Sequence, residues 1–185
     1  MALAAPAARA QRPAAVTQPA STQEFGVDAA ADFGLGSKSS VSIILPASRA
    51  RIGFFFGDSR WSVEPAAGLG YSKVKDESGK FLYDLQLGAL YHFRAPAEVY
   101  QTTGVRAAVA YVRPFIGVNG SSGGGSNNEF VFGGGLGVKT PLRPDVALRA
   151  EANLGYGTQN KAARLGAALG LSFFTRNGIP LPGGR

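Results

Sequence analysis

Between Glu24 and Phe174 the chain alternates apolar residues with polar or small ones at a period of two, which is the period of a β-strand. The clearest stretch is 80–93, where every second residue from Phe81 to Phe93 is aromatic, leucine or alanine. The same alternation predicts strands at 24–36, 49–57, 61–73, 80–93, 103–117, 128–139, 145–157 and 162–174. An even number of such strands favours a closed antiparallel barrel, because closure leaves no strand edge unpaired.

Two segments carry local irregularities. In 49–57 the aromatic residue Phe55 falls on the otherwise polar face, and residues 41–45 are a candidate upstream extension of this strand. In 61–73, Pro65 must remove one hydrogen bond from the ladder, because proline has no N–H to donate.

The segment 103–117 is the least regular of the eight. Its apolar face contains Arg113, which breaks the alternation. We therefore expect a β-bulge near Arg113 and Pro114. The apolar residues assigned to the outer face of this segment are Val105, Ala107, Val109, Tyr111 and Phe115.

Alternation alone does not distinguish a membrane barrel from a soluble, lipocalin-like barrel whose apolar side faces inward. The composition of the other face decides between them, since it is mostly glycine, alanine and serine, which suit the crowded interior of an eight-stranded barrel. Aromatic residues also gather at the strand ends around aliphatic middles, as in membrane barrels. They are Trp61, Tyr71, Phe81, Tyr83, Tyr91, Phe93, Phe115, Phe130, Phe132, Tyr156 and Phe173. The sequence thus predicts an all-β, closed antiparallel eight-stranded up-and-down transmembrane β-barrel.

Isolated charges on the polar face would then lie inside the barrel, where buried charges need partners. The acidic residues are Glu24, Asp28, Asp32, Glu64, Asp84, Glu129 and Glu151. The basic residues are Arg51, Arg106, Lys139, Arg149 and Arg164. These near-equal numbers predict a structural ion-pair network in the lumen and argue against acid–base catalysis.

Composition narrows the function further. The chain has no cysteine, which excludes disulfides and thiol chemistry, and no apolar run approaches the ~20 residues of a membrane helix. The net charge of +7 comes from scattered residues, without a basic helix or an RNA-binding motif, so nucleic acid is not an expected partner. The single histidine, His92, has no nearby serine or cysteine nucleophile and is expected to be structural. We predict no catalytic site, no metal and no cofactor.

The two ends differ from the centre in composition. Residues 1–10 end in Ala8-Arg9-Ala10, which fits the small-x-small pattern of a signal-peptidase site, so we interpret them as the remnant of a signal peptide. Residues 11–23 are expected to be a flexible periplasmic lead-in, 24–174 the barrel, and 175–185 a disordered tail.

The summed pattern resembles the small bacterial outer-membrane barrels of the OmpA-like and OmpX-like group, over about residues 24–174. The resemblance rests on aromatic-ended strands, the glycine-rich stretch 130–137 and a last strand that ends in Leu171-Ser172-Phe173-Phe174. It implies a porin-family outer-membrane barrel domain, located in the bacterial outer membrane. It also implies outer-membrane lipids and lipopolysaccharide as neighbours, and the barrel-assembly machinery and periplasmic chaperones as partners during biogenesis. We expect a monomer.

With both termini in the periplasm, turns 57–60, 94–101 and 140–145 would be periplasmic. The longer connections 37–48, 74–79, 117–127 and 158–161 would lie outside. Five lysines are then expected at the outer rim as candidate contacts to lipid phosphates, namely Lys38, Lys73, Lys75, Lys80 and Lys161.

The predicted function is non-enzymatic, with a structural, adhesive or membrane-integrity role and a lumen filled by side chains. Three alternatives stay open at this point. They are a narrow conduit for small hydrophobic solutes, as in OmpW-like barrels, a soluble lipocalin-like ligand-binding barrel, and a lipid-modifying enzyme.

Overall fold

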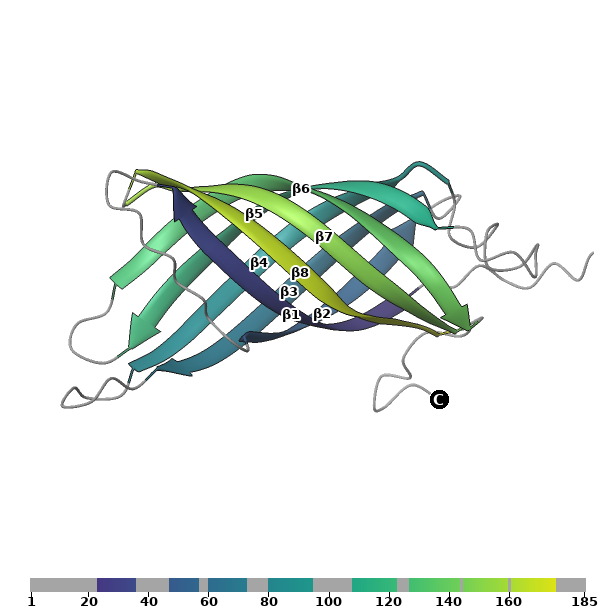
Figure 1. The fold of residues 1–185 in the computed structure, drawn as a ribbon, viewed down its shortest axis with the longest axis horizontal. Coiled ribbons are helices and arrows are strands. Elements are labelled where there is room, and N and C mark those ends of the chain that lie inside the picture. The colour runs from purple at the N-terminus through teal and green to yellow at the C-terminus, as the bar shows by residue number, and fades with distance from the viewer. Residues whose placement is uncertain are drawn as a thin grey trace, which may run out of the picture.

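A computed structural model describes residues 23–35, 47–56, 60–72, 80–94, 108–122, 127–143, 145–159 and 161–175. These residues form eight β-strands that wind around a common axis (Figure 1). The strands are β1 Gln23–Leu35, β2 Ala47–Phe56, β3 Trp61–Ser72, β4 Lys80–His92, β5 Val109–Ser122, β6 Asn127–Arg143, β7 Val146–Gly157 and β8 Ala162–Thr175. The expected signal-peptide remnant, most of the lead-in and the tail lie outside the described residues.

Each strand pairs antiparallel with its neighbours in the chain, and β1 pairs with β8 to close the barrel. The β1–β8 seam runs from Gln23 opposite Thr175 to Leu35 opposite Ala163. We call the end at Gln23 and Thr175 the terminal end and the opposite end the loop end. The predicted fold class is confirmed. Within the described ranges, no helix has the length and hydropathy needed to cross a bilayer.

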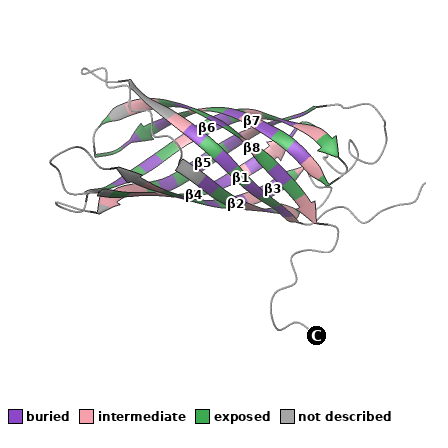
Figure 2. Cartoon of the chain, turned by 60° about the horizontal axis from the view of Figure 1, so that its bottom comes forward, coloured by how far each residue is buried: buried purple, intermediate pink, exposed green. Residues whose placement is uncertain are grey.

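The outside of the barrel is apolar and the inside is charged or small. Leu85, Leu87 and Leu169 are 53%, 49% and 56% exposed, whereas Glu64 and Arg149 are only 1% and 2% exposed. Buried and exposed positions alternate along most of the described length of the strands (Figure 2). The prediction that apolar residues face outward is therefore confirmed for these strands, and a soluble barrel with an inward apolar face is excluded.

In β5 the predicted faces are reversed. Val109, Tyr111 and Phe115 are buried in the lumen together with Arg113, while Ile116 and Val118 are exposed on the outside. The expected bulge at Arg113 and Pro114 is also wrong, because β5 pairs with β6 from Val109 to Ser121 without a shift. On the β4 side, however, Arg113 and Pro114 have no partner, because pairing stops at Gly88 opposite Phe115 and resumes at Tyr91 opposite Val112 in the same register. Apolar side chains occupy both faces of this strand, so the alternation of hydropathy does not show which face points into the lumen.

Two further irregularities lie elsewhere in the described strands. The register between β6 and β7 shifts between Pro141 and Arg143, near the terminal end. Pro65 pairs with Leu87 on β4 but has no partner in the β2–β3 register, where pairing stops at Ala66 and resumes at Val63. The expected local loss of pairing at Pro65 is thus observed on the β2 side.

Aromatic residues surround the outside of the barrel at both ends. At the terminal end, the Trp61 and Tyr91 rings lie 4.8 Å apart and Phe93 meets Tyr91 edge-on at 5.8 Å. Towards the loop end, the Phe132 and Tyr156 rings lie 5.6 Å apart. Between them the exposed side chains are mainly aliphatic, and this banding matches a bilayer bounded by two interfaces.

Candidate functional site: the charged lumen

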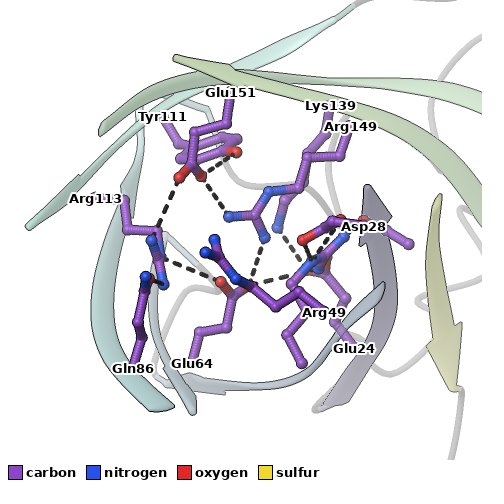
Figure 3. Close-up of polar contacts among 12 residues, drawn as sticks. Glu24, Asp28, Arg49, Glu64, Gln86, Tyr111, Arg113, Lys139, Arg149 and Glu151 are labelled. Atoms are coloured by element: carbon purple, nitrogen blue, oxygen red, sulfur yellow. Dashed lines mark hydrogen bonds and ion pairs between the residues drawn. The ribbon is translucent and has the colours of Figure 1, made fainter. Parts of the chain in front are cut away.

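Among the described residues, eight charged side chains contact one another in the middle and terminal half of the lumen, a group that we call the central network (Figure 3). Four are acidic and four are basic, so their formal charges cancel. Strands β1, β2, β3, β5, β6 and β7 supply them. They are Glu24, Asp28, Glu64, Glu151, Arg51, Arg113, Lys139 and Arg149, and each is no more than 5% exposed.

Glu64 joins opposite walls of the barrel. Its Oε2 accepts a hydrogen bond of 2.6 Å from Arg149 on β7, which lies four strands away around the barrel. The same oxygen lies 3.4 Å from Nη1 of Arg51 on β2, and Oε1 lies 3.3 Å from Nε of Arg113 on β5. Three cations therefore share one carboxylate. Arg51 lies on the strand next to Glu64, whereas Arg113 and Arg149 lie on strands that do not pair with β3.

Glu24 makes the second junction. Its Oε1 accepts a hydrogen bond of 2.5 Å from Arg51, and its Oε2 accepts one of 2.5 Å from Nζ of Lys139 on β6. Arg51 also donates through Nε to both carboxylate oxygens of Asp28, at 2.9 and 3.1 Å. The strongly buried Lys139 and Arg51 are thus neutralised mainly by β1.

Glu151 makes the third junction, near the middle of the barrel. Its carboxylate accepts hydrogen bonds from Arg149 at 2.5 Å, from the Tyr111 hydroxyl at 2.8 Å and from Arg113 at 3.3 Å. The guanidinium of Arg149 also lies 4.9 Å from the centre of the Tyr111 ring. Arg113 donates to Gln86 on β4 at 3.0 Å. Arg51 donates to Ser172 on β8 at 2.8 Å, so all eight strands are joined through these groups.

Two further ion pairs lie towards the loop end. Arg49 donates to Asp84 at 2.6 Å, and Gln86 connects Asp84 to the central network. Arg164 on β8 pairs with Glu129 on β6. The side chains of Asp84 and Arg164 are 20% and 29% exposed, in contrast to the central network. The central network is therefore buried from bulk solvent, whereas solvent reaches the ion pairs nearer the loop end.

Aromatic rings cover the terminal end of the lumen. The Phe55 ring lies 5.5 Å from His92 and 6.3 Å from Phe174, and His92 lies 5.7 Å from Tyr111. His92 Nδ1 is 3.0 Å from the carbonyl oxygen of Arg60, and Nε2 is 3.2 Å from Nζ of Lys139. His92 is thus buried with both ring nitrogens close to polar groups. Within the described ranges, no three His, Asp or Glu side chains are placed so that they could hold a metal ion.

Glycines give the large lumen side chains room to lie against the wall. Gly137 pairs with Tyr111 on one side and Glu151 on the other, and the Tyr111 ring lies over it to reach Glu151. A Cβ at Gly137 would collide with the Tyr111 ring and hydroxyl. Several glycines on the lumen face thus act as seats for neighbouring side chains.

The structure brings together most of the lumen residues expected from the sequence. Glu24, Asp28, Arg51, Glu64, Lys139, Arg149 and Glu151 are in the central network, and Asp84, Glu129 and Arg164 are in the outer pairs. Arg106 and the side chain of Asp32 lie outside the described residues.

Sequence reasoning missed five participants, which are Arg49, Gln86, Tyr111, Arg113 and Ser172. Arg49 could have been found, because it shares the lumen parity of Arg51. Tyr111 and Arg113 were missed because the faces of β5 were reversed.

Of the five rim lysines, only Lys161 has a described side chain. It is exposed in the turn between β7 and β8 and has a left-handed backbone, with φ of 47°. Lys80 begins β4 at the same loop end, although its side chain is outside the described residues. Lys38, Lys73 and Lys75 also lie outside the described residues.

An apolar, ring-bounded exterior around a charged, neutralised interior defines a transmembrane β-barrel of the outer-membrane class. Solved structures of this class match the chain. Neisserial surface protein A (NspA) matches with a TM-score of 0.56 at 19% identity, over 84% of this chain and 98% of that one. The N-terminal β-barrel domain of Pseudomonas aeruginosa OprF matches with a TM-score of 0.56 at 18% identity, over 84% and 100%.

Ail, the attachment invasion locus protein of Yersinia pestis, matches with a TM-score of 0.52 at 12% identity, over 83% of this chain and 97% of that one. A second Ail structure, in complex with the heparin analogue sucrose octasulfate, matches with a TM-score of 0.51 at 10% identity. No protein-family model and no curated protein matches the chain. The likeness therefore establishes the fold shared with these outer-membrane barrels.

Proposed function

We propose that this protein is a non-enzymatic integral protein of a bacterial outer membrane, with a structural, adhesive or membrane-integrity role carried out by the outside of a plugged barrel. The observation that carries this proposal is the central network, which crosses the lumen through the ion pair between Glu64 and Arg149 at 2.6 Å. The network leaves the outer surface and the loop end as the parts available to partners.

The sidedness of the strands supports the location. Apolar side chains such as Leu136, at 67% exposed, and Leu69, at 74%, would face water in a soluble protein at considerable cost. In a bilayer the same side chains face acyl chains. The closed ladder of strands gives the backbone N–H and C=O groups of each strand hydrogen-bond partners within the barrel.

The comparisons support an adhesive role as one form of this function. Ail is described as an attachment invasion locus protein, and NspA as a surface protein. Both share the fold of this chain, NspA with a TM-score of 0.56 and Ail with one of 0.52. By contrast, the fully buried charges of Arg51 and Glu24 give little support to an apolar conduit through this lumen.

Cell fractionation combined with gel mobility tests the proposal. We expect the protein in the outer-membrane fraction, soluble only with detergent, and migrating differently before and after boiling because the closed barrel resists dodecyl sulfate. Recovery in the soluble fraction without detergent would contradict the location. A steady ion current through the purified protein in planar bilayers would contradict the plugged lumen.

We further propose that lysines at the loop end contact phosphates of outer-membrane lipid, including lipopolysaccharide. Lys161 supports this, because it is exposed in a short turn at that end, and charge-assisted contacts to phosphate are strong. Lys161→Gln, alone and with Lys80→Gln, should lower co-purification of lipopolysaccharide. Arg143→Gln is the control, since Arg143 is 77% exposed at the terminal end. Equal lipopolysaccharide content in all three proteins would refute the contact.

We also propose that the protein is a monomer, that it takes no cofactor, and that the barrel-assembly machinery and periplasmic chaperones act on it during biogenesis. The closed ladder supports the monomer, because all eight strands find both of their partners within one chain.

A further inference from the structure

The β1–β8 seam presents a problem of register that the alternation of side chains does not solve. A slip by one residue would turn every lumen side chain outward, which the buried face forbids. A slip by two residues keeps each side chain on its own face. Some other feature of the seam must therefore select the observed register, in which Gly26 lies opposite Ser172 and Asp28 opposite Gly170.

A row of three residues crosses the seam at this level. Arg51 on β2 pairs with Gly26 on β1, and Gly26 pairs with Ser172 on β8. The Arg51 guanidinium lies over Gly26, where an added Cβ would collide with it. From there Nη2 donates to Ser172 Oγ at 2.8 Å and to the carbonyl oxygen of Leu171 at 3.3 Å.

We infer that this row, Arg51–Gly26–Ser172, is a latch that selects the register in which the first and last strands close the barrel. Ion pairs with Glu24 and Asp28 on β1 hold the Arg51 guanidinium next to the seam. Its remaining donor then requires an acceptor on β8, and only the correct register presents the Ser172 hydroxyl, which is fully buried.

The two alternative registers both lose this arrangement. If β1 slipped by two residues one way, Gly26 would face Phe174, and Arg51 would meet an aromatic ring in place of a hydroxyl. In the other direction Gly26 would face Gly170, which has no side chain to accept a hydrogen bond. The slip towards Phe174 would also place Asp28 against Ser172, and the other slip would place it against Ala168. In the observed register Asp28 occupies the space above Gly170.

Cross-linking measures the register directly, because the chain has no cysteine of its own. Ala29 and Leu169 face each other across the seam on the lipid side, while Ala167 and Leu171 mark the two slipped registers. We would combine Ala29→Cys with Leu169→Cys, Ala167→Cys or Leu171→Cys in turn. After refolding from urea into detergent, a short bifunctional thiol reagent would report the ratio of native to slipped cross-links.

Ser172→Ala is the main variant, since it removes the acceptor and adds no bulk. We expect the ratio of native to slipped cross-links to fall about tenfold, the effect of losing one hydrogen bond to a charged group. Gly26→Ala should lower the closed fraction on unboiled gels, because the added Cβ displaces the guanidinium. Gly68→Ala is the matched control on β3, where a Cβ would make only ordinary contact with Asp84 at 3.5 Å.

The outcomes separate cleanly. A fall in the ratio for Ser172→Ala, with wild-type behaviour for Gly68→Ala, supports the latch even if Gly26→Ala fails to refold. A wild-type ratio in Ser172→Ala overturns it. A loss of closure in Gly68→Ala equal to that in Gly26→Ala would also overturn it, because lumen glycines would then matter irrespective of the seam.

Discussion

At the scale of single residues, the lumen depends on neutralisation of each charge by its neighbours. Glu64 is 1% exposed and is shared by Arg51, Arg113 and Arg149. A charge at such a site has no water to compensate it if its partner is removed, and the cost of breaking a buried pair is correspondingly large.

Glu64→Gln tests this dependence, because it keeps the shape of the side chain and removes its charge. Four cations would then face three anions, and we expect the free energy of unfolding to fall by about 3–5 kcal/mol. Urea unfolding in detergent, followed by fluorescence of the single tryptophan, Trp61, measures it. Asp145→Asn is the control, since Asp145 is 64% exposed and pairs with Arg143 only at 3.9 Å. Equal midpoints for the two variants would show that the network adds no stability.

A second prediction at this scale concerns the lumen glycines over which neighbouring side chains lie. Gly137→Ala should displace the Tyr111 ring from its place over β6 and weaken its bond to Glu151, at a cost of about 1–3 kcal/mol in unfolding free energy. Gly134→Ala on the same strand is the matched control, because an added Cβ there meets nothing within 4 Å. The same urea titration should leave Gly134→Ala unchanged, and a similar loss in both variants would point to a general effect of glycine.

At the scale of the strand, the face on which a residue lies decides what it tolerates. Leu136 is 67% exposed near the middle of β6, and Leu142 is 46% exposed near the terminal end of the same strand. Leu136→Arg should lower the unfolding free energy by about 2–4 kcal/mol in lipid vesicles, and Leu142→Arg by less than about 1 kcal/mol. Equal effects would mean that no bilayer midplane lies at Leu136.

The strands also show how far the sequence leads. Alternation located all eight strands and the correct faces wherever one face was small or charged, as around Glu64 and Arg149. It failed in β5, because Tyr111 and Phe115 inside are as apolar as Ile116 and Val118 outside. In β5 the charge of Arg113 was the only sign of the lumen face. It was outweighed by the apolar residues that share this face, Val109, Tyr111 and Phe115.

The sequence predicts which charged residues lie in the lumen better than it predicts which of them pair. Glu64 and Arg149 meet across the barrel because of the relative heights of β3 and β7. Those heights depend on the stagger accumulated around the whole ring, a property that no single strand carries. The sequence could therefore indicate which charges enter the lumen but not which of them touch.

At the scale of the whole molecule, the burial of the central network predicts how the stability of the barrel responds to salt. Screening acts on charges in contact with solvent and very little on buried pairs. We expect the urea midpoint in neutral detergent to stay nearly constant as the salt concentration rises from about 0.1 to about 1 M. A steep fall in the midpoint would show that electrolyte penetrates to Glu24 and Lys139.

The equal numbers of acidic and basic groups in the central network have an electrical consequence. A voltage across a membrane exerts force on a body in proportion to its net charge, at roughly 2.3 kcal/mol per elementary charge for each 100 mV. Glu24, Asp28, Glu64 and Glu151 cancel Arg51, Arg113, Lys139 and Arg149, so a Donnan potential between the two sides exerts no net pull on them as a group. The central network therefore has no net charge through which a potential of either sign could pull it along the barrel axis.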